Sequence, residues 1–132
     1  MQWTPLLAVA ISLVPTLSVS EPREIVGRYC GTAWSGGRLV EVVTSLSTGP
    51  DGLIAGSYEF ADKGENTPGT LREFLKDDDD KRMLVWVDKY GTGQLTATFD
   101  RSRESFRGLW GDYAEAPTHR WDGLLCDRVA GG

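Results

Sequence analysis

Apolar and polar residues alternate along much of the chain with a period of two, the spacing of a strand that has one buried face. The clearest case is 94–100, where apolar side chains occupy the odd positions and polar ones the even positions. Turn signals rich in glycine separate such segments, and no amphipathic helix of useful length lies between them. The pattern predicts eight strands, over residues 25–34, 38–47, 53–60, 70–76, 82–89, 94–100, 105–113 and 119–128.

Residues 70–76 are the most ambiguous of these segments. Leu71, Phe74 and Leu75 fit one turn of helix, and the same segment also fits an edge-like strand. Exposed loops are expected on both sides, at 61–69 and 76–82. The second contains four adjacent aspartates (77–80), whose charges must be solvated.

Short links favour antiparallel neighbours, because parallel pairs need long crossovers. Eight sequential antiparallel strands predict an all-β fold, a small up-and-down barrel whose closure removes the exposed strand edges. A two-sheet β-sandwich is the alternative. Four segments place a glycine between two large residues on one face, a layout that resembles the avidin and lipocalin style of small barrel: Ile25-Gly27-Tyr29, Ile54-Gly56-Tyr58, Phe106-Gly108-Trp110 and Trp121-Gly123-Leu125.

The positions of the two cysteines allow a test of whether the barrel closes. If the aromatic and glycine positions face inward, Cys30 on the first strand and Cys126 on the last both face outward. The first and last strands are neighbours in a closed meander. We therefore predict a disulfide between Cys30 and Cys126 across the seam, in an oxidising compartment.

The chain has 132 residues, and the first 20 carry no charge. Their apolar run is broken by Pro15 and ends in small residues, as in a secretory signal peptide. The run is shorter than the ~20 apolar residues that span a bilayer, so no stable membrane anchor is expected after cleavage. The prediction is a signal peptide over 1–20 and one domain over 21–132, secreted or periplasmic. The net charge of −5 argues against a nucleic-acid partner.

Tryptophans and strand glycines are the features that bear on binding. Inward glycines can allow strand curvature, allow close packing, or leave an empty lumen. An eight-stranded barrel is normally filled by its own side chains, which favours curvature and close packing over a lumen. Tryptophan is ordinarily core, yet its ring also stacks on apolar ligands. Trp34 ends a strand and is expected at the barrel mouth. The candidate ligand-binding residues are Trp34, Tyr58, Trp86, Trp110 and Trp121.

Signals for catalysis and metal binding are weak. His119 is the only histidine, and no serine or cysteine lies in a nucleophile motif. The aspartate run lacks the spaced ligands of a calcium loop. We predict no catalytic residue, metal or cofactor. The leading hypothesis is an exported, non-enzymatic binding protein that holds a small molecule in the barrel mouth. A protein-binding module or inhibitor acting through the exposed loops is the alternative, and an enzyme ranks lowest.

Overall fold

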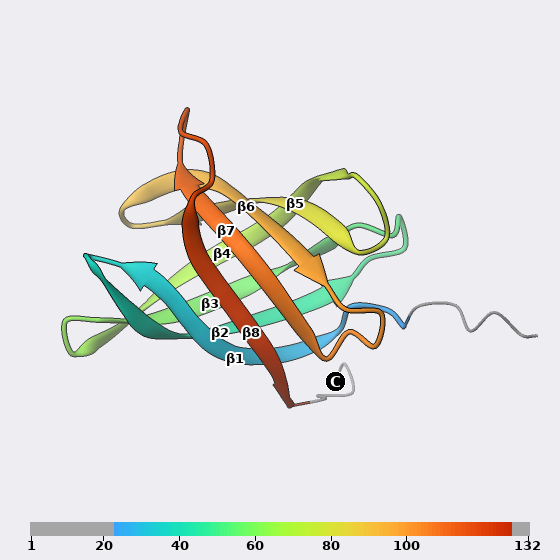
Figure 1. The fold of residues 1–132 in the computed structure, drawn as a ribbon, viewed down its shortest axis with the longest axis horizontal. Helices are drawn as coiled ribbons and strands as arrows, with labels where there is room; N and C mark the ends of the chain where they lie inside the picture. Colours follow the sequence, from blue (N-terminus) through green and yellow to red (C-terminus); the bar gives the residue numbers. More distant parts are fainter. Residues whose placement is uncertain (1–22, 128–132) are drawn as a thin grey trace, which may run out of the picture.

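The computed structural model describes residues 23–127, so the predicted signal peptide over 1–20 lies outside the described residues. The described chain is a closed barrel of eight antiparallel strands in sequential order, as predicted (Figure 1). Within residues 23–127, no helix is long and apolar enough to cross a membrane. The strands are β1 (Gly27–Ser35), β2 (Arg38–Thr48), β3 (Ile54–Asp62), β4 (Glu65–Lys76), β5 (Lys81–Asp88), β6 (Gly91–Phe99), β7 (Ser105–Asp112) and β8 (His119–Asp127).

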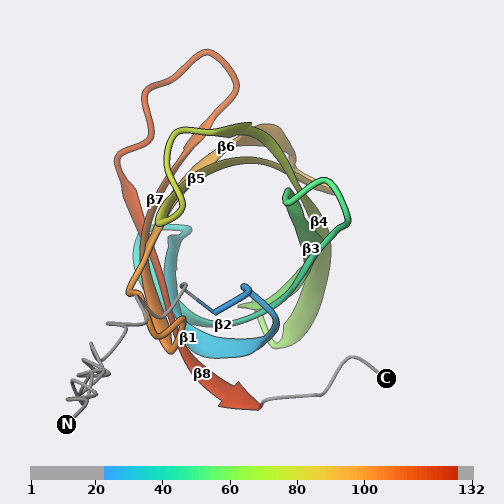
Figure 2. The ribbon, with the colours of Figure 1, turned by 90° about the vertical axis from the view of Figure 1, so that its right-hand side faces the viewer.

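The seam between β1 and β8 closes the barrel (Figure 2). The two strands pair antiparallel, with an irregularity between Arg28 and Tyr29. Cys30 and Cys126 are joined by a disulfide on the outer side of this seam, with their α-carbons 5.7 Å apart. The predicted bond is confirmed, and it fits an oxidising environment such as the periplasm or the cell exterior.

The inward faces form one core that is densest in one half of the barrel. Tyr29 lies at its centre, with the rings of Phe99 and Phe106 packed edge-on or tilted at centroid distances of 5.3–5.8 Å. Ile25, which precedes β1, is buried beneath them. The inward parity predicted for the glycine-bearing segments therefore holds in this half, where side chains fill the barrel.

Buried arginines complete this closed end, where the β2–β3, β4–β5 and β6–β7 turns meet. Arg103 donates to the Arg23 carbonyl at 3.0 Å, to the Asp79 carbonyl at 2.9 Å and to the Asp80 carboxylate at 2.7 Å. Arg82 donates to the carbonyls of Gly52 and Asp79 at 3.1 Å each. The two guanidiniums thus tie the N-terminal segment and the turns into a lid, because each offers several donors in a fixed geometry.

The β3–β4 region corrects one expectation and decides one alternative that the sequence left open. Residues 61–69 are not a long loop: Lys63 and Gly64, with φ of 51° and 85°, form a tight hairpin turn between β3 and β4. Residues 70–76 belong to β4 and are not helical. Phe74 points outward by the alternation of the strand, and a register shift between Glu73 and Leu75 leaves Leu75 outward as well, so the two are 48% and 50% exposed.

Candidate functional site

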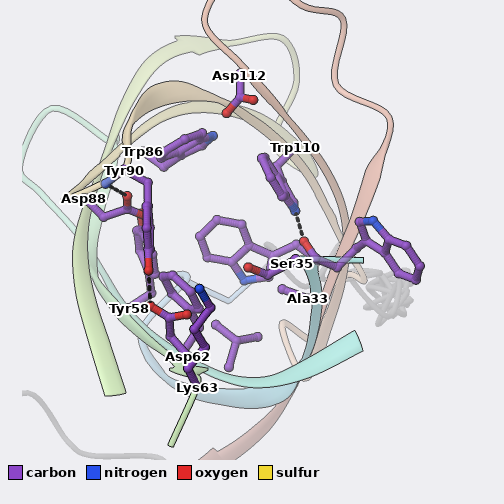
Figure 3. A pocket seen from close by; sticks show the side chains of 15 residues that line it. Ala33, Ser35, Tyr58, Asp62, Lys63, Trp86, Asp88, Tyr90, Trp110 and Asp112 are labelled. Carbon is purple, nitrogen blue, oxygen red and sulfur yellow. Dashed lines mark hydrogen bonds between the residues drawn. The ribbon is translucent and has the colours of Figure 1, made fainter. Parts of the chain in front are cut away.

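The other end of the barrel is open and holds a cavity of about 310 Å³ (Figure 3). The β1–β2, β3–β4 and β5–β6 turns and the β7–β8 link surround it. The five aromatic residues predicted from the sequence all line this cavity: Trp34, Tyr58, Trp86, Trp110 and Trp121. The structure thus brings the predicted set together, while their binding of a ligand stays a prediction.

Aromatic rings form the floor and walls of the cavity. Trp121 and Tyr58 pack edge to face with centroids 4.7 Å apart, and both are buried. Trp86 and Trp110 stand at 90° to each other with centroids 5.5 Å apart. Trp34 lies at the rim and is 40% exposed. The cavity therefore offers mostly ring surface, which suits an apolar or π-interacting ligand.

The indole N–H groups of these walls are already used within the protein. Trp86 donates to the Gly111 carbonyl at 3.1 Å, and Trp110 donates to the Trp34 carbonyl at 3.0 Å. Trp121 donates to the Thr44 hydroxyl at 3.0 Å. These bonds fix the orientation of the rings and leave their faces, rather than their polar edges, to meet a ligand.

Cross-strand glycines hold two of the rings against the barrel wall. Tyr58 pairs with Gly69 on β4, and a β-carbon at position 69 would lie 2.1 Å from Tyr58 Cζ. Trp86 likewise pairs with Gly93 on β6, where a β-carbon would lie 2.7 Å from the indole ring. Each ring thus lies over bare backbone of the next strand, and the space beyond it remains open.

Three aspartates occupy the mouth, each as the last residue of a strand: Asp62 on β3, Asp88 on β5 and Asp112 on β7. Tyr58 donates its hydroxyl to Asp88 Oδ2 at 2.8 Å, and Tyr90 donates its hydroxyl to Asp62 Oδ2. Among the described residues, no side chain or backbone group hydrogen-bonds to the Asp112 carboxylate. The mouth is therefore rich in acceptors.

These contacts shift the titration of the groups involved. Burial, reinforced by the Asp88 carboxylate, raises the pKa of Tyr58 far above its usual range. The Tyr90 hydroxyl holds the pKa of Asp62 below its ordinary value, and Asp62 in turn raises the pKa of Tyr90. Lys89 lies 3.6 Å from Asp62 and 5.1 Å from the Tyr90 ring centroid. At neutral pH both tyrosines are neutral donors, and Asp62 is ionised.

Sequence reasoning missed the polar part of this site. The aspartates at the ends of β3, β5 and β7 and the exposed Tyr90 after β5 were not singled out. A signal was present, because each aspartate directly precedes a turn or link. To use this signal, the end of each strand must be known to within one residue, and sequence patterns do not locate strand ends that closely.

Other candidates lie away from this cavity or do not assemble. His119 begins β8 with its ring 4.7 Å from the Trp110 ring, and it does not line the cavity. In the part of the chain that the structure describes, no three His, Cys, Asp or Glu side chains group as a metal site would require. Comparison with protein-family models, curated proteins and solved structures finds no match to this chain.

Proposed function

We propose that this protein is an exported, non-enzymatic binding protein that holds a small molecule in the open end of its barrel. The observation that supports it is the cavity of about 310 Å³, which falls at the small end of the range for ligand sites. Buried arginines close the other end of the barrel, so the fold has one filled end and one open end. The rings at the open end are oriented by hydrogen bonds before any ligand arrives.

The alternative, a protein-binding module or inhibitor, has less support. It relied on exposed loops at 61–69 and 76–82, and the first of these is a tight hairpin turn. In the second, the Asp78 carboxylate accepts backbone hydrogen bonds from Asp80 and Lys81, which order the aspartate run as a compact turn. Neither segment offers an apolar anchor of the kind that dominates protein interfaces.

A filled-cavity variant tests the proposal. Ala33 points into the cavity from β1, whereas Ala55 is exposed on the outer face of β3. The neutral dye N-phenylnaphthylamine, which fluoresces in apolar surroundings, serves as the probe. We expect saturable binding by the unmodified protein and by Ala55→Leu, and a loss of about tenfold or more in affinity for Ala33→Leu. Equal dye binding by both variants, or no binding by the unmodified protein, would contradict the proposal.

A further inference from the structure

We propose that the ligand of the cavity is a small organic cation, an ammonium group on an apolar body, and that Asp112 is the carboxylate that faces it. This inference rests on the proposed function and adds the charge of the ligand to it. The cavity itself is the primary feature. The arrangement of donors, acceptors and ring faces around it then decides which ligand chemistry it can satisfy.

The ring faces favour a positive charge. An aromatic ring carries negative potential over its face, so a cation gains energy within ~6 Å of the ring centroid. Trp86 and Trp110 meet at a right angle and offer two ring surfaces to one small group. Tyr58 adds a third ring, and its hydroxyl hydrogen is turned away toward Asp88. Several faces around one space form the kind of aromatic cage that recognises ammonium groups.

The hydrogen-bonding inventory points the same way. The indole N–H groups of Trp86, Trp110 and Trp121 and the hydroxyls of Tyr58 and Tyr90 all donate to protein oxygens, and the lining residues with neutral donors outside this set are Trp34 and Ser35 at the rim. An anionic ligand needs donors, and among the described lining residues the remaining cationic donor is the exposed Lys63 at the rim. Carboxylates attract a cationic ligand by charge, and they accept hydrogen bonds from any N–H or O–H that it carries.

Asp112 is the carboxylate best placed for this role. Asp62 accepts hydrogen bonds from Tyr90 and Thr67 and lies near Lys89, and both oxygens of Asp88 accept protein hydrogen bonds. Asp112 has no such partner among the described residues. Figure 3 shows its carboxylate at the rim, on the side of the cavity where Trp86 and Trp110 stand. An ammonium that lies against the two indoles from the cavity side would therefore meet Asp112 at the entrance.

Three probes of nearly one shape separate charge from size. Choline is the cation, and neohexanol (3,3-dimethylbutanol) replaces its nitrogen with carbon. The anion tert-butylacetate (3,3-dimethylbutanoate) carries a negative charge on the same branched body. Competition with N-phenylnaphthylamine and the quenching of tryptophan fluorescence measure their affinities. We expect choline to bind about tenfold or more tightly than neohexanol, because its charge interacts with ring faces and carboxylate. We expect tert-butylacetate to bind most weakly.

A matched pair of aspartate variants locates the effect. Asp112→Asn removes a carboxylate at the mouth, and Asp127→Asn removes one at the end of β8 near the closed end. We expect choline affinity to fall about fivefold or more in Asp112→Asn and to stay unchanged in Asp127→Asn, with neohexanol unaffected in both. Equal losses in the two variants, or none in Asp112→Asn, would overturn the assignment of Asp112.

The outcomes also separate this inference from the proposed function. If the dye binds in the cavity but choline binds no better than neohexanol, the cation inference is wrong and the proposed function stands. If neither the dye nor any of the three probes binds, both are wrong. Tighter binding of tert-butylacetate than of choline would overturn the cation inference by itself.

Discussion

The buried ion pair between Glu73 and Arg82 allows a direct test of how the closed end is held. Their side chains are 0% and 6% exposed, and Arg82 Nη1 donates to Glu73 Oε1 at 2.8 Å. The same oxygen accepts the Ile54 backbone N–H at 2.8 Å. Glu73 Oε2 is buried with no hydrogen-bond partner in the described structure. The carboxylate thus depends on Arg82 for neutralisation.

Substitution of either partner leaves the other charge buried. Such a loss costs about 3–5 kcal/mol, and a typical domain has a free energy of unfolding of about 5–15 kcal/mol. For Glu73→Gln we expect about 3 kcal/mol, because Arg82 keeps its bonds to the carbonyls of Gly52 and Asp79. For Arg82→Met we expect about 5 kcal/mol, because Glu73 retains only the Ile54 N–H.

The double variant distinguishes this reasoning from simple loss of packing. With neither charge present, the remaining cost is that of the Gly52 carbonyl left without a donor, about 1–3 kcal/mol, because Arg103 still donates to the Asp79 carbonyl. We therefore expect the double variant to be less destabilised than the sum of the single ones, by about 3 kcal/mol.

Urea unfolding followed by tryptophan fluorescence measures each free energy. Glu59→Gln, on the exposed face of β3, removes the same charge where it is solvated and is expected to change stability by less than about 0.5 kcal/mol. Additive single-variant losses would refute the reasoning, because they would mean that the two charges do not depend on each other.

Three further predictions concern the seam, the cavity wall and alkaline pH. Joint replacement of Cys30 and Cys126 by serine opens a loop of 96 residues and should cost up to about 4.7 kcal/mol by urea unfolding, with no effect of added reductant on the variant. Gly69→Ala should displace the Tyr58 ring, cost about 1–3 kcal/mol and weaken dye binding. Because the folded pKa of Tyr58 is raised above its ordinary 10.0, its contribution to stability should be complete below about pH 10 and be lost as pH rises toward the folded pKa. Tyr58→Phe should flatten that loss.

The barrel could be predicted from the sequence because its determinants are local. Alternation identifies each strand, glycine-rich turns separate the strands, and short links fix antiparallel order. The disulfide followed from parity combined with barrel closure and an oxidising compartment, since Cys30 and Cys126 lie next to inward positions on strands that must meet. The strands and turns compare a residue only with its close neighbours in sequence, and the disulfide adds only the closure that their order implies.

The sequence left one segment undecided where a partner on the next strand matters. Residues 70–76 fitted one turn of helix or an edge-like strand, and the structure has a strand there, with Phe74 and Leu75 exposed and Glu73 inside. The buried Glu73 carboxylate is neutralised by Arg82, which lies nine residues later on the adjacent strand β5. Hydrophobicity carries no record of such a partner, so the apolar pattern could neither decide between helix and strand here nor show that Glu73 is buried.

The candidate site divides in the same way. Parity indicates that Tyr58, Trp86, Trp110 and Trp121 face inward, and this was enough to group them. It does not indicate that the barrel is filled around Tyr29 and hollow around Trp86. That difference depends on which side chains from different strands lie at the same height along the barrel axis. The pairing register of the strands sets this height.

Trp121 connects the two ends of the barrel and limits how each can change. Its ring is buried in the core, packs against Tyr58 and lines the floor of the cavity, while its N–H is held by Thr44 on β2. A smaller residue at this position would deepen the cavity and remove core packing together. Binding and stability are therefore coupled at Trp121, whereas Ala33 and Asp112 can alter the cavity from its wall and its rim. Changes in ligand preference should accordingly be easiest to obtain at the wall and rim positions, with the tryptophan floor kept intact.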